Sequence, residues 1–214
     1  MRSVELHCKD LSKKFLNKII FKNLDLTLSG GDSLSITGRN GSGKSTLIKV
    51  ISNLIRETSG QVIINIDGKE IPQEKRYRYI GLVAPYLNLY DELNAFENLD
   101  FFYRLKNKNT SGKTSNEKIN TLLDRVNLYS RRGDLVKNYS SGMKQRLKMA
   151  FSIISEPEIL FMDEPRTNLD KEGIEIAYSI AEEQKQRGIL IIATNEAEDL
   201  HLCKRQINIE DYSV

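Results

Sequence analysis

The sequence lacks tryptophan and contains only two cysteines, two histidines and four prolines among 214 residues. Cys8 and Cys203 lie far apart in the chain and have no metal-ligand spacing. We therefore expect buried free thiols in a reducing compartment rather than a cysteine-bound metal or a disulfide.

Long apolar runs are also missing. No run approaches the ~20 residues that cross a bilayer, and the first five residues lack the apolar core of a signal peptide. The net charge of +3 is too small to indicate a nucleic-acid partner. If the protein serves a membrane, we expect it to do so from the cytoplasmic side, through a partner. A chain of this length buries a real core, and we expect one domain with a subdomain.

One glycine-rich stretch fits the phosphate-binding pattern G-x-x-x-x-G-K-[ST], and it reads Gly38-Arg39-Asn40-Gly41-Ser42-Gly43-Lys44-Ser45-Thr46. Glycines at the fourth and sixth places let successive backbone N–H groups approach a polyphosphate. Lys44 offers a positive charge to the β- and γ-phosphates, and the Ser45 hydroxyl can ligate Mg²⁺. A predicted strand at 33–37 precedes the loop and a predicted helix starts at Thr46. A glycine-rich surface turn would not require this context.

Strands and helices are predicted to alternate along the chain. The strands are expected at residues 4–10, 19–28, 33–37, 61–66, 80–84, 159–162 and 189–194, with a closing segment at 206–210. The helices are expected after the phosphate loop and at residues 94–106, 117–128, 143–154 and 172–187, with a solvated loop at 106–116. This order predicts an α/β fold with a mostly parallel sheet.

Two acids, Asp163 and Glu164, directly follow the apolar run 159–162. A buried strand that carries two acids to the edge of a sheet costs free energy unless they are used there. Asp163 can hold Mg²⁺, directly or through water, and Glu164 can orient or deprotonate an attacking water. The alternative is a pair of helix N-cap residues without chemistry.

Three further stretches make a family recognisable, and they read Leu89-Tyr90-Asp91-Glu92-Leu93-Asn94-Ala95-Phe96-Glu97-Asn98-Leu99, Tyr139-Ser140-Ser141-Gly142-Met143-Lys144-Gln145-Arg146-Leu147 and Asp163-Glu164-Pro165-Arg166-Thr167-Asn168-Leu169-Asp170. They resemble the segment after the Q-loop, the signature motif, and the acidic strand with its D-loop in ATP-binding cassette (ABC) ATPases. The resemblance covers essentially the whole chain.

The resemblance implies an α/β P-loop NTPase fold of the ABC type in a single domain, 1–214. Its mostly parallel core sheet would carry an N-terminal antiparallel β subdomain and a helical subdomain. Residues 1–84 and 156–214 would form the RecA-like core with the β subdomain. Residues 85–155 would approximately form the helical subdomain with the signature motif.

The resemblance also implies ATP hydrolysis with Mg²⁺ at the interface of two cassettes, in a homodimer or a heterodimer with another cassette. Residues 38–46 would hold the phosphates, Ser45 and Asp163 the Mg²⁺, and Glu164 would be catalytic. Phe15 matches the adenine-stacking aromatic, although a core or hairpin phenylalanine is as consistent with the sequence. Contacts to ATP on the opposite subunit would come from Ser140, Ser141, Gly142, Met143 and Asp170.

Two positions depart from the family's pattern. The Q-loop glutamine aligns with Pro85, which has no polar side chain and no N–H; Tyr86 or Asn88 are the nearby substitutes. The switch histidine falls on Asn195, which can hydrogen-bond a γ-phosphate but carries neither proton nor charge. Ser141 and Met143 are milder changes within the signature. We expect the changes at 85 and 195 to affect the rate of ATP turnover and not the binding of the nucleotide.

The first functional hypothesis is an ATP-hydrolysing subunit that powers an ABC transporter through nucleotide-driven dimerisation. It would be cytoplasmic and peripheral on the inner face of the cell membrane. Residues 85–105 would form much of the surface that grips a cytoplasmic helix of an integral-membrane permease subunit; the alternative for this surface is ordinary packing within the helical subdomain. The chain's compactness is similar to the small ATPases of haem-exporter-like and ABC-2-type systems. The membrane subunits would select the substrate.

Two alternatives stay open. One is a nucleotide-gated interaction module with weak or no hydrolysis, which the changes at 85 and 195 motivate and Glu164 opposes. The other is a soluble, non-transport ABC ATPase. The chain has no sustained heptads typical of repair ATPases and only one cassette, unlike translation ATPases, which leaves cofactor assembly within that class.

Overall fold

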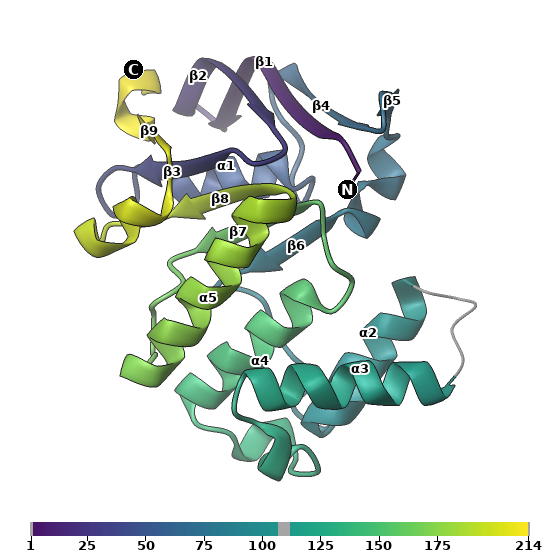
Figure 1. Cartoon of the computed structure of the whole chain (residues 1–214). Coiled ribbons are helices and arrows are strands. Elements are labelled where there is room, and N and C mark those ends of the chain that lie inside the picture. The colour runs from purple at the N-terminus through teal and green to yellow at the C-terminus, as the bar shows by residue number, and fades with distance from the viewer. Residues whose placement is uncertain (1, 107–111, 214) are drawn as a thin grey trace.

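The computed structural model describes residues 2–106 and 112–213, which form two sheets and a set of helices (Figure 1). The strands are β1 (Val4–Phe15), β2 (Lys18–Ser29), β3 (Ser33–Thr37), β4 (Ser59–Ile66), β5 (Lys69–Glu70), β6 (Ile80–Val83), β7 (Ile159–Asp163), β8 (Ile189–Ala193) and β9 (Arg205–Asn208). The α-helices are α1 (Lys44–Ile51), α2 (Ala95–Lys106), α3 (Gly112–Arg125), α4 (Ser141–Ile153) and α5 (Lys171–Arg187). Short 3-10 turns lie at Gln73–Arg78, Tyr129–Arg131, Val136–Asn138, Ala197–Leu202 and Ile209–Tyr212.

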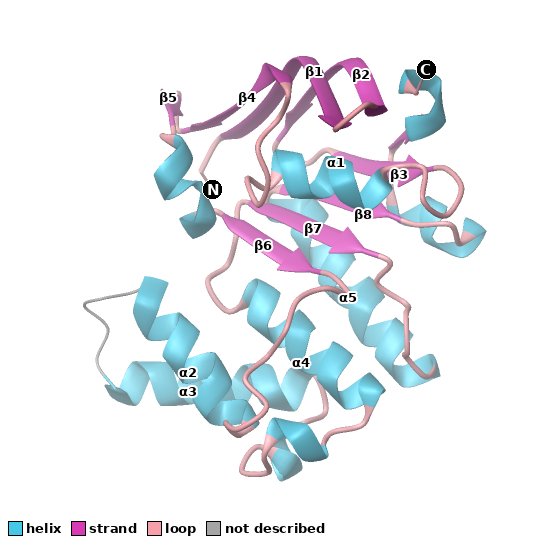
Figure 2. Ribbon diagram, turned by 180° about the vertical axis from the view of Figure 1, so that it is seen from behind, coloured by secondary structure: helices cyan, strands magenta, loops and turns pink. Residues whose placement is uncertain are grey.

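The parallel sheet has the order β6-β7-β8-β3-β9, and every pair in it is parallel. Its central strands are apolar throughout because both faces are covered. Ile159 and Phe161 of β7 join a hydrophobic cluster with α1, whereas Leu160 and Met162 join a second cluster with α4 and α5. Figure 2 shows α1 on one side of this sheet and α4 and α5 on the other. The predicted buried strand at 159–162 is therefore confirmed.

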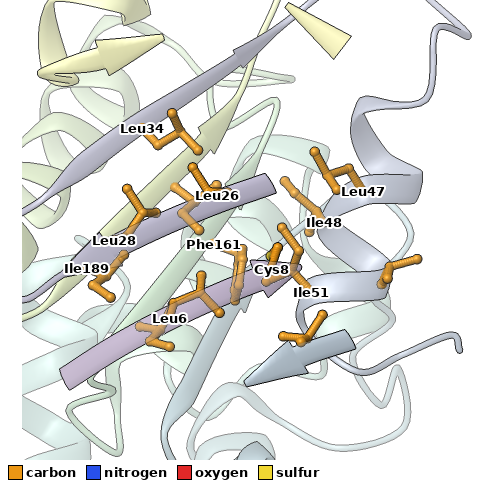
Figure 3. Close-up of a cluster of buried hydrophobic side chains, with 14 of the residues drawn as sticks. Leu6, Cys8, Leu26, Leu28, Leu34, Leu47, Ile48, Ile51, Phe161 and Ile189 are labelled. Carbon is orange, nitrogen blue, oxygen red and sulfur yellow. The ribbon is translucent and has the colours of Figure 1, made fainter. Parts of the chain in front are cut away.

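The antiparallel sheet has the order β2-β1-β4-β5 and covers α1. Alternate residues of β2 are buried and exposed, as the sequence pattern predicts for a sheet with one wet face. Figure 3 shows the core between this sheet, α1 and β7. The fully buried side chains that meet there include Leu6 of β1, Leu28 of β2, Ile48 and Ile51 of α1, and Phe161 of β7.

Three helices, α2, α3 and α4, pack against one another beneath the parallel sheet. α3 starts at Gly112, within the stretch where the sequence predicted a loop; residues 107–111 of that stretch lie outside the described part. The local composition is polar, but Ile119, Leu122 and Leu123 are buried against the neighbouring helices. This tertiary packing outweighs the weak local preference for a loop.

The hairpin of β1 and β2 is longer than predicted. The strands pair up to Phe15 and Lys18, because Leu16 takes a left-handed conformation (φ 50°) and closes a tight turn. Both cysteines are free thiols. Cys8 is buried, as predicted, whereas Cys203 is only partly buried. Burial raises the pKa of each thiol to about 12.

Gly81 lies where β6 crosses α4, and a Cβ there would sit 2.2 Å from the Ser152 carbonyl oxygen. We predict that Gly81→Ala lowers the free energy of unfolding by about 3 kcal/mol, because the new methyl group clashes with a backbone oxygen that cannot move without shifting α4. Gly133→Ala is the control, since nothing lies within 4 Å of its Cβ, and we expect a change below about 0.5 kcal/mol. Urea unfolding measures both. Equal stability of the two variants would contradict the close approach of β6 and α4.

Candidate functional site

The glycine-rich loop joins the carboxyl end of β3 to α1. Gly43 has a positive φ (116°), and a Cβ there would lie 2.5 Å from Ile20 Cγ2. Gly38 is similarly confined, since a Cβ on it would lie 2.7 Å from Ser42 Oγ. Within the described residues, the backbone N–H groups of Gly41 and Gly43 have no acceptor. Free N–H groups at a helix N-terminus favour an anion.

Lys44 is 5% exposed and curls back over this loop. Its Nζ donates to the carbonyl oxygens of Gly38 (2.8 Å) and Arg39 (3.2 Å) and to Asn195 Oδ1 (2.6 Å). Burial lowers the pKa of Lys44. Nearby carboxylates oppose that shift, and they belong to Glu164, Asp163 and Glu210. Because all three hydrogen-bond acceptors are neutral, the ammonium group can still attract a phosphate.

Asp163, at the end of β7, is 1% exposed, and neither carboxylate oxygen has a hydrogen-bond partner among the described residues. Burial raises the pKa of Asp163, and the nearby Ser45 hydroxyl acts in the opposite direction. An unpartnered buried carboxylate is costly.

This carboxylate fits a divalent cation. One carboxylate and one hydroxyl oxygen, completed by phosphate oxygens and water, are a typical Mg²⁺ environment. The described residues contain no group of three or more His, Cys, Asp or Glu side chains that could hold a metal alone. A cation here would take further oxygen ligands from water or from a bound ligand.

Glu164 follows at the point where β7 turns away from the sheet. Its φ is 47°, which is rare for a residue with a side chain, and its N–H donates to the Ala193 carbonyl at 2.8 Å. Such strain is frequent at functional sites. Glu164 lines a cavity of about 380 Å³ together with Asn40 and Asn195. The two acids of the sequence motif thus have different surroundings: one is buried beside the loop and the other faces the cavity.

Asn195 lies two residues after the end of β8, beside the glycine-rich loop. Its Oδ1 accepts from Lys44 Nζ, and its Nδ2 donates to Asn40 Oδ1. The structure therefore brings Asn195 into contact with the glycine-rich loop, and its role at a γ-phosphate stays a prediction.

The segment after β6 carries Pro85 at the position of the family's glutamine, with Tyr86 and Asn88 as the two substitutes considered. Pro85 is exposed, and its carbonyl accepts from Lys148 Nζ at 3.1 Å. Asn88 is also exposed. Tyr86, in contrast, points a buried hydroxyl without a hydrogen-bond partner towards Asp163. Of the two substitutes considered, only Tyr86 reaches the site.

The signature residues lie elsewhere in the chain. Ser140 caps α4, its Oγ accepting from the Met143 N–H at 3.2 Å, while Ser141 is exposed and Gly142 partly so. α4 and α1 pack on opposite faces of the parallel sheet. Within the described residues, no hydrogen bond or ion pair joins the signature to residues 38–46. The signature and the glycine-rich loop are not brought together within one chain.

Asp170 and Phe15 are both at the surface. Asp170 caps α5, and its Oδ1 accepts from the Gly173 N–H at 2.9 Å. Phe15 is 48% exposed at the tip of the β1–β2 hairpin, with Lys13 Nζ 4.7 Å from its ring centroid. Ile20, near that tip, contacts the glycine-rich loop at Gly43. An exposed ring near the loop is compatible with stacking on a base.

Sequence reasoning missed two groups around the site. The chain after β9 returns to the loop, where Glu210 accepts from the Arg39 N–H at 3.4 Å. Beside the cavity, buried Asp199 accepts from Thr194 Oγ1 at 2.6 Å and from Tyr178 at 2.8 Å. The first contact joins residues that are distant in sequence. The second lies around a turn that matches no known motif, so the local sequence does not predict either contact.

Comparison with models of protein families matches residues 21–167 to the ABC transporter family. The chain belongs to this family of transporter ATPases, as the resemblance predicted. The α/β fold of ABC ATPases is also confirmed. The chain superposes with a TM-score of 0.86 and 25% identity on a dimeric, post-hydrolysis structure of the ATP-binding cassette MJ0796 bound to ADP and Pi. That match covers 98% of this chain and 96% of the other.

Among curated relatives, the ABC transporter ATP-binding protein YdbJ of Bacillus subtilis is 35% identical over 96% of this chain, which spans 66% of YdbJ. The cytochrome c biogenesis ATP-binding export protein CcmA of Photobacterium profundum is 32% identical over 93% of this chain and 97% of its own length. The chain spans only half of the daunorubicin resistance protein DrrA3 of Streptomyces coeruleorubidus, at 37% identity. No helix within residues 2–106 and 112–213 is long and apolar enough to traverse a bilayer.

The cap role of Asp170 is measurable without nucleotide. We predict that Asp170→Ala lowers the free energy of unfolding by about 1 kcal/mol, because the Gly173 N–H loses its acceptor. Asp170→Asn keeps an acceptor oxygen and should cost only about 0.3 kcal/mol. Chemical denaturation compares the two. A loss as large for asparagine as for alanine would assign the effect to the charge instead of the cap.

Proposed function

We propose that this chain hydrolyses Mg·ATP as one cassette of an ABC dimer and thereby powers transport. The observation that carries the proposal is the buried, unpartnered carboxylate of Asp163, close to Ser45 and Lys44. The cation of Mg·ATP would supply the partner that the Asp163 carboxylate lacks. Family membership raises the same expectation from an independent direction.

Each side chain then has a defined task. Lys44 and the free N–H groups of residues 38–46 bind the β- and γ-phosphates. Ser45 and Asp163 hold the cation, which when bound neutralises charge on the phosphate oxygens. Glu164, facing the cavity, orients the attacking water and takes its proton. Asn195 donates a neutral hydrogen bond to the γ-phosphate.

The site needs a second cassette. The signature, Ser140 to Met143, is exposed or half-exposed and does not contact its own glycine-rich loop. A head-to-tail partner, a second copy or a related cassette, would place its signature and its Asp170 against this chain's nucleotide. The structurally similar cassette MJ0796 is dimeric with ADP and phosphate bound, which supports this arrangement.

A membrane partner fits the aromatic cluster formed by Tyr90, Phe101, Phe102 and Phe151. The ring centroids of Tyr90 and Phe102 lie 5.7 Å apart, and those of Phe102 and Phe151 4.6 Å apart. Tyr90 and Phe101 stay 50% and 43% exposed. We infer that this cluster receives a cytoplasmic helix of an integral-membrane permease, so that the protein acts at the inner face of the membrane. The export role in the name of CcmA supports a transport partner.

The division into subdomains belongs to the same proposal. The helices α2, α3 and α4 share one hydrophobic cluster, and they fall within residues 85–155. Residues 1–84 and 156–214 would then form the nucleotide-binding core with the antiparallel sheet. One single domain, 1–214, would carry both.

The second candidate is a nucleotide-gated interaction module. Exposed Pro85 and uncharged Asn195 favour it, since neither supplies a protonatable group at the γ-phosphate. In this case ATP closes the dimer and the closed form is the signal. Wild-type protein isolated with its membrane partner would bind Mg·ATP without releasing phosphate.

Glu164→Gln separates the two candidates. We predict that phosphate release falls about 100-fold or more, because the amide cannot accept a proton, while ATP binding persists. ATP-dependent dimers, followed by size-exclusion chromatography with light scattering, should accumulate in the variant. Glu175→Gln, at an exposed position of α5, is the matched control and should match wild type. Wild-type turnover already as low as that of Glu164→Gln would favour the gated module.

Phe101→Asp tests the docking surface. We predict that co-purification of an integral-membrane protein from native membranes falls about tenfold or more, because a charge replaces an aromatic contact. Loss of the ring contacts with Tyr90 and Phe102 should lower the free energy of unfolding by about 1 to 2 kcal/mol, which leaves the protein folded. Tyr77→Asp, equally exposed outside the cluster, is the control. Unchanged recovery of the membrane protein with Phe101→Asp would rule out this cluster as the contact.

A further inference from the structure

Two buried polar groups, the Asp163 carboxylate at the end of β7 and the Tyr86 hydroxyl in the loop after β6, have no hydrogen-bond partner among the described residues. β6 and β7 are paired in parallel, with Val83 beside Met162. Asp163 is the next residue on β7, and Tyr86 lies three residues beyond Val83. The Tyr86 hydroxyl and both Asp163 oxygens are buried and, among the described residues, have no hydrogen-bond partner. A tyrosine hydroxyl can donate a hydrogen bond, and carboxylate oxygens accept one.

The Tyr86 ring is held in place from α1. Lys49 Nζ lies 3.9 Å from the centroid of the ring, a distance at which an ammonium group is attracted to an aromatic face. Lys49 stands one helical turn after Ser45, on the same side of α1. The ring is thus fixed relative to the helix that carries the Ser45 hydroxyl.

The preceding residue, Pro85, cannot donate a hydrogen bond towards Asp163. Pro85 is exposed, and Lys148 Nζ binds its carbonyl at 3.1 Å and the Ala84 carbonyl at 3.3 Å. These bonds fix the backbone of the loop to α4. Tyr86 is therefore the residue of this loop whose polar atom reaches Asp163.

We propose that Tyr86 is a positioning residue for the cation of Mg·ATP. Its hydroxyl donates a hydrogen bond to an oxygen around that cation, either the Asp163 carboxylate or a bound water, and so replaces the side chain that Pro85 lacks. The inference rests on the proposed Mg·ATP site. It adds a specific consequence: the hydroxyl matters for the metal-bound nucleotide and not for the nucleotide alone.

Tyr86→Phe tests this, because it removes the hydroxyl and keeps the ring under Lys49. The affinity for the β,γ-imido analogue of ATP is measured by calorimetry with Mn²⁺ and, separately, with EDTA. We expect the affinity with Mn²⁺ to fall roughly three- to tenfold and the metal-free affinity to stay unchanged. Electron paramagnetic resonance of Mn²⁺ gives a second readout of the same site.

The matched control is Tyr129→Phe, an exposed tyrosine on the 3-10 turn Tyr129–Arg131, which should equal wild type in both conditions. Without nucleotide, Tyr86→Phe should melt at the same temperature as wild type or higher, since it deletes an unpartnered buried hydroxyl. A lower melting temperature, or equal losses with and without metal, would mean a packing role and overturn the proposal.

Two further outcomes separate this inference from the proposed function. Wild-type affinity of Tyr86→Phe with Mn²⁺, in a protein that binds the analogue and hydrolyses ATP, would overturn the role of Tyr86 alone. A wild-type protein that binds the analogue no better with Mn²⁺ than with EDTA would contradict the Mg·ATP site, and the inference would fail with it.

Discussion

The burial of Asp163 without a protein partner is the constraint on which the rest of the site depends. β7 must be apolar because it serves two hydrophobic clusters at once, one on each face of the sheet. Its last residue is nevertheless an acid with 1% of its surface exposed. Removing a carboxylate from water costs free energy, and the apolar packing of the strand does not offset that cost. The fold places this unpartnered carboxylate beside the loop that leads into α1, where a bound cation could offset the cost.

The glycine-rich loop carries a positive charge, Lys44, near the buried negative charge of Asp163. Lys44 has only neutral acceptors, two carbonyls and the Asn195 amide oxygen. A histidine at 195 could bring a proton or a positive charge, whereas asparagine brings a dipole. In the proposed site, Lys44 would supply the charge that attracts a γ-phosphate, and Asn195 would supply a directed hydrogen bond. On that proposal, the change at 195 would affect turnover before it affects binding.

The sequence predicted those features that local geometry dictates. Glycine is required at 43 by a positive φ and a close neighbour, and such a requirement appears directly as a motif. The apolar run of β7 is local in the same sense. The contacts of Tyr86 with Lys49 and of Glu210 with Arg39 join residues far apart in sequence. Periodicity and propensity contain no information on such pairs. The early start of α3 was missed because packing, rather than composition, decides it.

The loop after β6 connects three parts of the molecule. Tyr86 contacts Lys49 of α1 on one side of the sheet, and Lys148 of α4 binds the carbonyls before it on the other. Four residues further on, the backbone of Tyr90 exchanges hydrogen bonds with the buried Asn98 of α2, at 2.9 and 3.0 Å. A loop fixed at both ends in this way moves as a unit with its neighbours. In the proposed site, the Tyr86 hydroxyl would therefore act at the cation and would also link the cation to the helices that carry the signature and the aromatic cluster.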